Sequence, residues 1–270
     1  MAESLRFDEN ERRALEADGF AVRRAVFDAR ELREICDACE ALMERILAER
    51  RRTKHPAGAY VFELSRSLGT MVKWEKHDPE LVHGIEPFAH LSEELNGWAH
   101  DPRLIEPCKD IVGGDDVGLF TEKLNLKRAR RGGPVVLHQD YPYWVDTAGD
   151  ASKVATAMLF LDDATVEKGC LEVAPGSHRE GEQRRRSVEG FGSFEMDPEK
   201  FDLARLVPLE VPAGSVAFFG AFLVHRSLPN QSDDDRRALL YSYQPAGFPT
   251  MRELQLRAQQ ERDRARQERA

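Results

Sequence analysis

Two histidines and one aspartate are the residues of this chain whose types and spacing could carry out chemistry. His138 and Asp140 stand two residues apart, and His225 lies far downstream at the end of the apolar run 215–224. On a strand, residues i and i+2 face the same side about 6.5–7 Å apart, so their side chains can lean toward one point. Two imidazoles and one carboxylate can cover one face of an octahedron. That donor set is typical of non-haem Fe(II) sites with open positions.

Neither motif is sufficient alone, because an His-x-Asp triplet is common by chance and a single histidine is more often packed or at the surface. The sequence around His225 strengthens the interpretation. Ser227 follows on the same strand face, and Arg236 and Arg237 open another apolar strand. A guanidinium that enters a barrel interior is costly unless it meets an anion. A dicarboxylate cosubstrate is a natural partner, since an arginine binds a carboxylate with two hydrogen bonds.

The residues that must position these side chains form a run of short strands. After Val117, apolar or alternating segments separated by turn signals predict an all-β sandwich or barrel, at 117–128, 134–141, 153–162, 170–174, 206–211, 215–224 and 235–244. Before them, the pattern predicts helices at 8–18, 28–51, 86–98 and 101–112, a short strand at 20–22, and an irregular stretch at 52–80 with a possible strand at 60–62.

These elements predict one mainly β domain with flanking helices. It spans about residues 8–250, with a helical part at 8–112 and a β core at 117–246. The polar insertion 179–202 is interpreted as a lid or a mobile surface, and the charged tail 251–270 as a surface helix or disordered segment.

Composition limits the classes of function. The chain has 270 residues and a formal net charge of −9, which argues against general binding to nucleic acid or anionic membranes. No apolar run reaches the length of a membrane span and the N-terminus lacks a signal-peptide core, so we expect a cytoplasmic protein. Cys36 and Cys39 lie inside an expected helix without a second metal-ligand pair, which favours a structural role.

Taken together, the motifs resemble the phytanoyl-CoA dioxygenase family, which includes the ectoine hydroxylases. The resemblance covers about residues 8–246. It rests on Leu15-Glu16-x-x-Gly19-Phe20-x-Val22, His138-x-Asp140, Gly169-Cys170-Leu171-x-Val173-x-Pro175-Gly176-Ser177-His178 and His225-x-Ser227-x-x-Asn230-x-Ser232-x-x-x-Arg236-Arg237.

The resemblance implies a double-stranded β-helix (a jelly roll) that holds Fe(II), uses 2-oxoglutarate as cosubstrate and consumes O₂. His138, Asp140 and His225 would be the iron ligands. Arg236, eleven residues after His225, would bind the distal carboxylate of 2-oxoglutarate. The other cosubstrate contacts would come from Ser227, Asn125 and Trp144.

One position departs from the family pattern. The residue after the distal histidine is often glycine, and here it is Arg226, which we interpret either as a surface residue or as part of the substrate entrance.

The carboxylate of Asp140 favours hydroxylation over halogenation, because related halogenases carry a small residue there to leave room for chloride. The expected reaction hydroxylates an unactivated C–H of a small metabolite or natural-product intermediate, releasing succinate and CO₂. Desaturation, cyclisation or epimerisation, a non-catalytic metal- or 2-oxoglutarate-binding sensor, and a sugar-binding or storage jelly roll remain alternatives. We expect a monomer or homodimer.

Several other residues near these motifs have two interpretations. Tyr141, Tyr143 and Trp144 are expected to border the pocket. The arginines at 128, 130 and 131 could bind a substrate anion or form a solvated strand end. Phe219 is a pocket wall or plain core, and His178 is expected to pin a turn.

Overall fold

The computed structural model describes residues 5–48, 54–57, 60–65, 67–183, 185–187 and 194–268. Its α-helices are α1 (Glu9–Asp18), α2 (Ala29–Ala48), α3 (Glu93–Trp98), α4 (Pro102–Val112), α5 (Tyr141–Trp144) and α6 (Met251–Gln267). The strands are β1 (Phe20–Arg23), β2 (Lys54–Ala57), β3 (Tyr60–Ser65), β4 (Thr70–Glu75), β5 (Val82–Glu86), β6 (Val117–Lys127), β7 (Val135–His138), β8 (Ala155–Phe160), β9 (Leu171–Val173), β10 (Arg185–Ser187), β11 (Phe194–Met196), β12 (Val207–Leu209), β13 (Val216–Gly220), β14 (His225–Ser227) and β15 (Arg236–Pro245).

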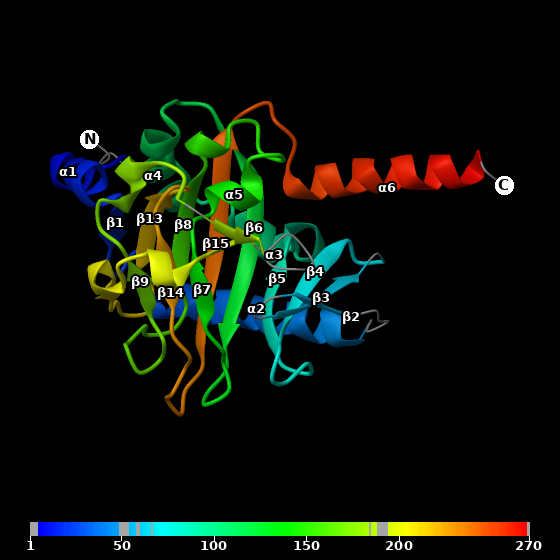
Figure 1. The fold of residues 1–270 in the computed structure, drawn as a ribbon, viewed down its shortest axis with the longest axis horizontal. Helices are drawn as coiled ribbons and strands as arrows, with labels where there is room; N and C mark the ends of the chain where they lie inside the picture. The colour runs from blue at the N-terminus through cyan, green and yellow to red at the C-terminus, as the bar shows by residue number, and fades with distance from the viewer. Residues whose placement is uncertain are drawn as a thin grey trace.

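Two antiparallel sheets form the body of the molecule. The large sheet has the strand order β1-β13-β8-β15-β6-β5-β4-β3-β2, and the small sheet has the order β12-β9-β14-β7. In Figure 1 the small sheet lies in front of β13, β8, β15 and β6, while α2 runs behind the large sheet. This arrangement confirms the predicted mainly β fold with flanking helices.

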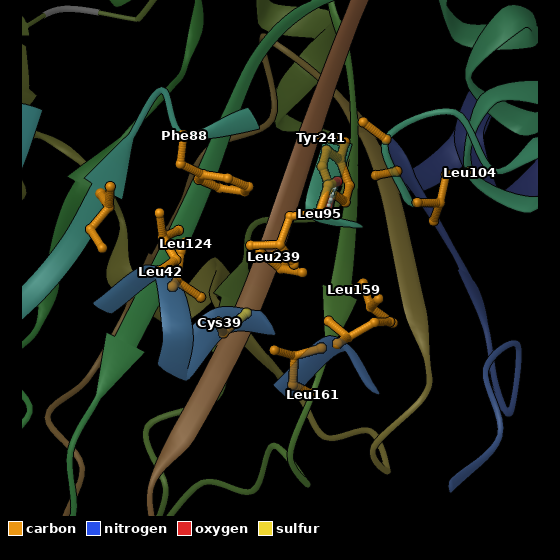
Figure 2. Close-up of a cluster of buried hydrophobic side chains, with 14 of the residues drawn as sticks. Cys39, Leu42, Phe88, Leu95, Leu104, Leu124, Leu159, Leu161, Leu239 and Tyr241 are labelled. Carbon is orange, nitrogen blue, oxygen red and sulfur yellow. Dashed lines mark hydrogen bonds between the residues drawn. The ribbon is translucent and has the colours of Figure 1, made fainter. Parts of the chain in front are cut away.

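The two faces of the large sheet contribute to different cores, because side chains alternate along each strand. Leu159 and Leu239 point to the face covered by α2, α3 and α4 and join the main cluster of buried apolar residues (Figure 2). Their neighbours Met158 and Leu240 point the other way and pack with Leu171 of the small sheet. The first core holds the helices on the sheet, and the second joins the two sheets around the site.

Leu239→Ala tests the weight of the helix-side core. Leu239 is fully buried in that cluster, so we expect the free energy of unfolding to fall by about 2–5 kcal/mol, the usual cost of a Leu→Ala cavity. Chemical denaturation measures the change. The matched control is Leu256→Ala on the exposed surface of α6, where we expect a change within about 0.5 kcal/mol. Equal losses in the two variants would contradict this account of the core.

Helix α1 begins and ends where its sequence predicts. The Asp8 side chain accepts hydrogen bonds from the backbone of Asn10 and Glu11, and the Glu11 side chain accepts one from the backbone of Asp8. This capping box satisfies amide groups that a helix start leaves unpaired. Gly19 ends the helix in the left-handed region, at φ 88°, which glycine adopts without strain.

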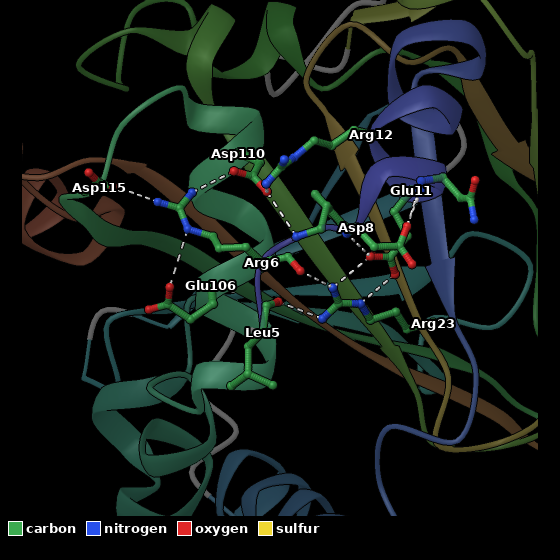
Figure 3. Close-up of polar contacts among 11 residues, drawn as sticks. Leu5, Arg6, Asp8, Glu11, Arg12, Arg23, Glu106, Asp110 and Asp115 are labelled. Atoms are coloured by element: carbon green, nitrogen blue, oxygen red, sulfur yellow. Dashed lines mark hydrogen bonds and ion pairs between the residues drawn. The ribbon is translucent and has the colours of Figure 1, made fainter. Parts of the chain in front are cut away.

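Two arginines fasten this N-terminal segment to the rest of the fold (Figure 3). Arg23 donates to both carboxylate oxygens of Glu11, at 2.7 and 2.9 Å, and also to the backbone carbonyls of Leu5 and Arg6. The Arg6 side chain donates to Asp110 of α4 at 2.8 Å. Residues before the first strand are therefore tied to both β1 and α4.

Three predictions about the N-terminal half were wrong in detail. The stretch 52–80, expected to be mostly irregular, contains β2, β3 and β4. These strands lie within residues 8–112, the part predicted to be helical, and they extend the large sheet. The helix expected at 86–98 is shorter: β5 runs to Glu86, a cis peptide bond precedes Pro87, and α3 begins only at Glu93.

The remaining segments are only partly described. In the insertion 179–202, β10 and β11 pair as a hairpin, while Arg184 and residues 188–193, including Gly190 and Gly192, lie outside the described residues. The tail forms α6, which extends away from the body in Figure 1. None of the helices in the described part of the chain is long and apolar enough to cross a membrane.

Candidate metal centre and adjoining cavities

His138 and His225 face each other across two paired strands. They are direct partners in the antiparallel pairing of β7 with β14, and their ring centroids are 4.1 Å apart. Side chains directly opposite in such a pair lie on the same face at close distance. The sequence prediction was wrong about the strand: the apolar strand β13 ends at Gly220, and His225 begins β14 in the other sheet.

Asp140 lies just beyond the end of β7, not on the strand as expected. The backbone turns there into α5, and Asp140 has helical dihedral angles. Gln139, which is buried, fixes the bend: its amide donates to the carbonyls of Gly181 and Phe222 and accepts from the backbone of Gln183. The bend brings the Asp140 carboxylate to 3.7 Å from His138 Nε2.

The three side chains offer a donor set that fits one metal ion. One ligand atom from each residue lies within 4.8 Å of the others. His138 Nδ1 is 2.8 Å from its own strand's Val136 carbonyl, and His225 Nδ1 is 3.0 Å from the Leu223 carbonyl. Because a carbonyl only accepts, both Nδ1 atoms carry the proton, and each Nε2 keeps its lone pair for a metal.

The charges of the site also suit a cation. Burial lowers the pKa of His138 to about 3, helped by the neighbouring His225, so the His138 ring is neutral and able to bind a metal near neutral pH. Burial alone would raise the pKa of Asp140, but Lys123 and the two histidines outweigh it and lower this pKa. Asp140 is therefore a carboxylate, the form in which it can act as a ligand.

A small inner cavity of about 60 Å³ lies beside the three side chains. Its wall includes Arg236, Ser227 and Asn125, together with all three members of the triad. Arg236 Nε and Nη1 and Ser227 Oγ are buried without a hydrogen-bond partner in the part of the chain that the structure describes. Burial lowers the pKa of Arg236 to about 10, which still leaves the guanidinium charged. A buried, unpaired guanidinium beside a hydroxyl is a ready site for a carboxylate.

The arginine next to it has a different environment. Arg237 Nε and Nη2 each donate to Asp162 at 2.9 Å, so Arg237 already has its anion. The alternation of side chains along β15 puts one arginine into the inner cavity and the other outside it. Arg236, the residue expected to bind the distal carboxylate, is the one that lines the inner cavity.

A larger outer cavity of about 220 Å³ shares His138 and Asp140 with the inner one. Its wall is mostly apolar or aromatic, and includes Tyr143, Trp144 and Met251 of α6. Trp144 was expected with the cosubstrate contacts, but it lies on the wall of this outer cavity, with its ring edge-on to Phe120. Tyr141 lines neither cavity among those described and stacks on Phe222.

The polar residues of the outer wall include two lysines, Lys73 and Lys123, and the carboxylates of Glu86 and Asp140. Lys123 Nζ is 3.7 Å from Glu86 and 3.9 Å from Asp140. Glu86 also accepts a hydrogen bond from Thr121 at 2.9 Å. Lys73 lines both cavities and lies over the rings of Tyr60 and Phe62, at 5.6 and 5.8 Å. Burial and the charge of Lys123 lower the pKa of Lys73 to about 8.

The arginines that precede the metal motif lie outside both cavities. Arg128 pairs with Asp235 at 2.6 Å, Arg130 with Asp233 at 2.7 Å, and Arg131 with Asp78. Arg130 and Arg131 are also about 60% exposed. Of the two interpretations, the structure favours a solvated strand end.

The remaining residues that the sequence singled out make contacts typical of structural residues. Arg226 pairs with Glu172 at 2.6 Å on the outer side of β14, as expected for a surface residue. Phe219 serves in both expected ways, since it belongs to the core between the sheets and lines the inner cavity. His178 packs closely on Gly19 and lines neither the inner nor the outer cavity. Cys39 is buried as a free thiol in α2.

Sequence reasoning missed the two cavity lysines. Lys123 could have been found, because it stands two residues before Asn125 on β6 and so faces the same side. Gln139 had no such signal, since its role depends on a bend. Lys73 had none either, because β4 lies in the stretch taken as irregular.

The chain is similar to several known proteins. L-proline trans-4-hydroxylase of Streptomyces griseoviridis is 29% identical over 183 residues, 60% of this chain and 66% of that protein. Methylphosphonate hydroxylase of Gimesia maris is 28% identical over 199 residues, 72% of each chain. The crystal structure of EctD from S. alaskensis with 2-oxoglutarate and 5-hydroxyectoine superposes with a TM-score of 0.71 at 21% identity, covering 93% of this chain and 80% of that one.

At that identity the structural likeness shows the fold alone, a double-stranded β-helix. The matched segment also spans just under two thirds of the proline hydroxylase, at 66% of its length. The family is settled by the sequence profile of phytanoyl-CoA dioxygenases (PhyH), which matches residues 15–238, and the chain belongs to that family.

Proposed function

We propose that the protein is an Fe(II)- and 2-oxoglutarate-dependent dioxygenase that hydroxylates an unactivated C–H of a small molecule. One observation carries the proposal: an open His/Asp/His donor set and an unpaired, buried arginine line the same cavity. The donor set suits Fe(II) with positions left open, and the arginine suits the far carboxylate of a five-carbon diacid.

The residues would divide the work as follows. His138, His225 and Asp140 hold the metal, with both rings fixed by their Nδ1–H bonds to backbone carbonyls. Arg236 and Ser227 bind the distal carboxylate of 2-oxoglutarate, and Asn125 contacts the same molecule. Bound iron with 2-oxoglutarate and O₂ would supply the oxidising chemistry, with succinate and CO₂ as co-products.

The outer cavity supports a catalytic role over a sensor. A protein that only reads out 2-oxoglutarate needs no second space, whereas this cavity of about 220 Å³ borders His138 and Asp140. Because this volume lies below the range of about 300–1,000 Å³ usual for pockets of drug-sized ligands, it suits a small metabolite or a compact natural-product intermediate. Trp144, on its wall, would exclude water and shape the substrate side of the site.

We further propose a cytoplasmic protein, a monomer or homodimer, that does not bind nucleic acid. The net charge of −9 supports the last point. The catalytic unit would be a single domain of about residues 8–250, followed by the charged segment 251–270.

An anaerobic absorption measurement tests the proposal. Fe(II) and 2-oxoglutarate added together should produce a weak visible charge-transfer band that neither gives alone. Admission of O₂ should then yield succinate slowly even without substrate. A band without succinate, across a broad panel of small molecules, would favour the sensor, and the absence of any band would refute cosubstrate binding.

A further inference from the structure

We propose that the substrate carries an anionic group, a carboxylate, phosphonate or phosphate, and that Lys73 binds this group in the outer cavity. The inference rests on the proposed function, which it deepens by naming the chemical class of the substrate. It starts from the one cation of the outer cavity whose contacts in the described part of the chain include no carboxylate.

Among the described residues, Lys73 has no anionic partner. Its ammonium contacts the ring faces of Tyr60 and Phe62, and in the described residues it makes neither a hydrogen bond nor an ion pair within 4.0 Å. The nearby carboxylate Glu86 is already engaged by Lys123 and Thr121. A half-buried ammonium without an anion is costly, so its position on a cavity wall indicates a ligand that compensates it.

The charges that line the two cavities lead to the same result. The cations are Lys73, Lys123 and Arg236, and the carboxylates are Glu86 and Asp140. A ferrous ion and a dianionic 2-oxoglutarate would cancel each other. One positive charge then remains, and a substrate with one anionic group would neutralise it. His83, which also lines the inner cavity, is balanced by its own hydrogen bond to Glu75 at 2.9 Å.

The geometry assigns the anion to the substrate side. Arg236 lines only the inner cavity, whereas Lys73 lines the outer cavity as well, which borders His138 and Asp140. The outer wall also has an apolar part, which includes Phe62, Met71 and Met251. A compact molecule with an apolar body and one anionic end fits such a wall, since the body packs on the apolar groups and the end pairs with the ammonium.

Binding of matched probes tests the assignment. Butyrate and methylphosphonate are the anionic probes, butyramide is the neutral one and butylammonium the cationic one. Their dissociation constants are measured by ligand-observed NMR on the full chain, in the presence and absence of Fe(II) and 2-oxoglutarate under anaerobic conditions. The variants are Lys73→Met, the conservative Lys73→Arg, and the surface control Lys200→Met, whose side chain is 56% exposed.

We expect both anions to bind the native protein and the other two probes to bind much more weakly. Lys73→Met should weaken anion binding at least about tenfold, the usual effect of losing a hydrogen bond to a charged group. Lys73→Arg should retain most of the affinity, and Lys200→Met all of it. Butyramide binding as tightly as butyrate, no anion binding by the native protein, or unchanged anion affinity in Lys73→Met would each overturn the inference.

A titration with 2-oxoglutarate separates this inference from the proposed function. If Lys73 serves the substrate, Lys73→Met keeps the affinity for 2-oxoglutarate measured by the absorption band. A loss of cosubstrate affinity with anion binding intact would assign Lys73 to 2-oxoglutarate and overturn the inference, while the proposed function would stand. A protein that gives no band at all but binds the anions through Lys73 would refute the proposed function and leave the anion site in place.

Discussion

His225→Ala is expected to abolish iron-dependent turnover. The substitution removes one of three donor atoms that lie within 4.8 Å of one another, and His138 and Asp140 alone cannot cover a face of the metal. Loss of a residue that merely orients a ligand already costs about 10–100-fold in metal affinity, so loss of the ligand itself should cost more than about a hundredfold. Equilibrium dialysis of Fe(II) and succinate formation measure the two effects.

The control is His100→Ala, an exposed histidine at the end of α3 whose ring nitrogen bonds to a backbone carbonyl. It should keep native iron affinity and turnover. Circular dichroism should show that both variants keep the β-rich fold, since His225 makes its backbone pairs with β7 and β9 whatever its side chain. Native iron affinity in folded His225→Ala would remove this residue from the metal site.

Arg236→Ala is expected to raise the 2-oxoglutarate concentration required for turnover while leaving iron binding intact. Losing a charge-assisted, two-point contact with a carboxylate should cost about 2–4 kcal/mol, roughly thirtyfold to several-hundredfold in affinity. The matched control is Arg237→Ala, one residue away on the opposite face of β15 and paired with Asp162. Titration of the absorption band measures both variants, and equal losses, or no loss in Arg236→Ala, would refute the assignment.

A second variant at this position separates binding from folding. Without 2-oxoglutarate, Arg236 is a buried cation with two unpaired nitrogens, a state that costs free energy. Arg236→Met keeps most of the side-chain volume and removes that charge. The cosubstrate-free variant should therefore unfold at the same or a higher denaturant concentration than the native protein, although it binds 2-oxoglutarate poorly.

Strands β8 and β15 of the β core were predictable because they are buried on both faces and therefore read as short apolar runs between turn signals. The expected segments match these observed strands closely. β4 was missed for the opposite reason. Its residues Met71 and Lys73 face a cavity, so one side of the strand mixes apolar and charged residues as a surface loop would.

The triad was predictable because its residue types are specific, but its supports were not. The apolar residues 221–224 look like a continuation of β13, and only the three-dimensional path shows that the chain turns there and brings His225 into the other sheet. Lys73 and Lys123 come together through the pairing of β4 with β5 and of β5 with β6. Such non-local neighbours leave no trace in the spacing of one sequence.

Crystallography at the iron absorption edge, on protein loaded anaerobically with Fe(II) and 2-oxoglutarate, would locate both the metal and the cosubstrate. We expect one anomalous peak bonded at once to His138 Nε2, His225 Nε2 and an Asp140 oxygen, with the far carboxylate of 2-oxoglutarate on Arg236. A peak elsewhere, a peak that lacks any one of these three ligands, or a diacid bound away from Arg236 would contradict it.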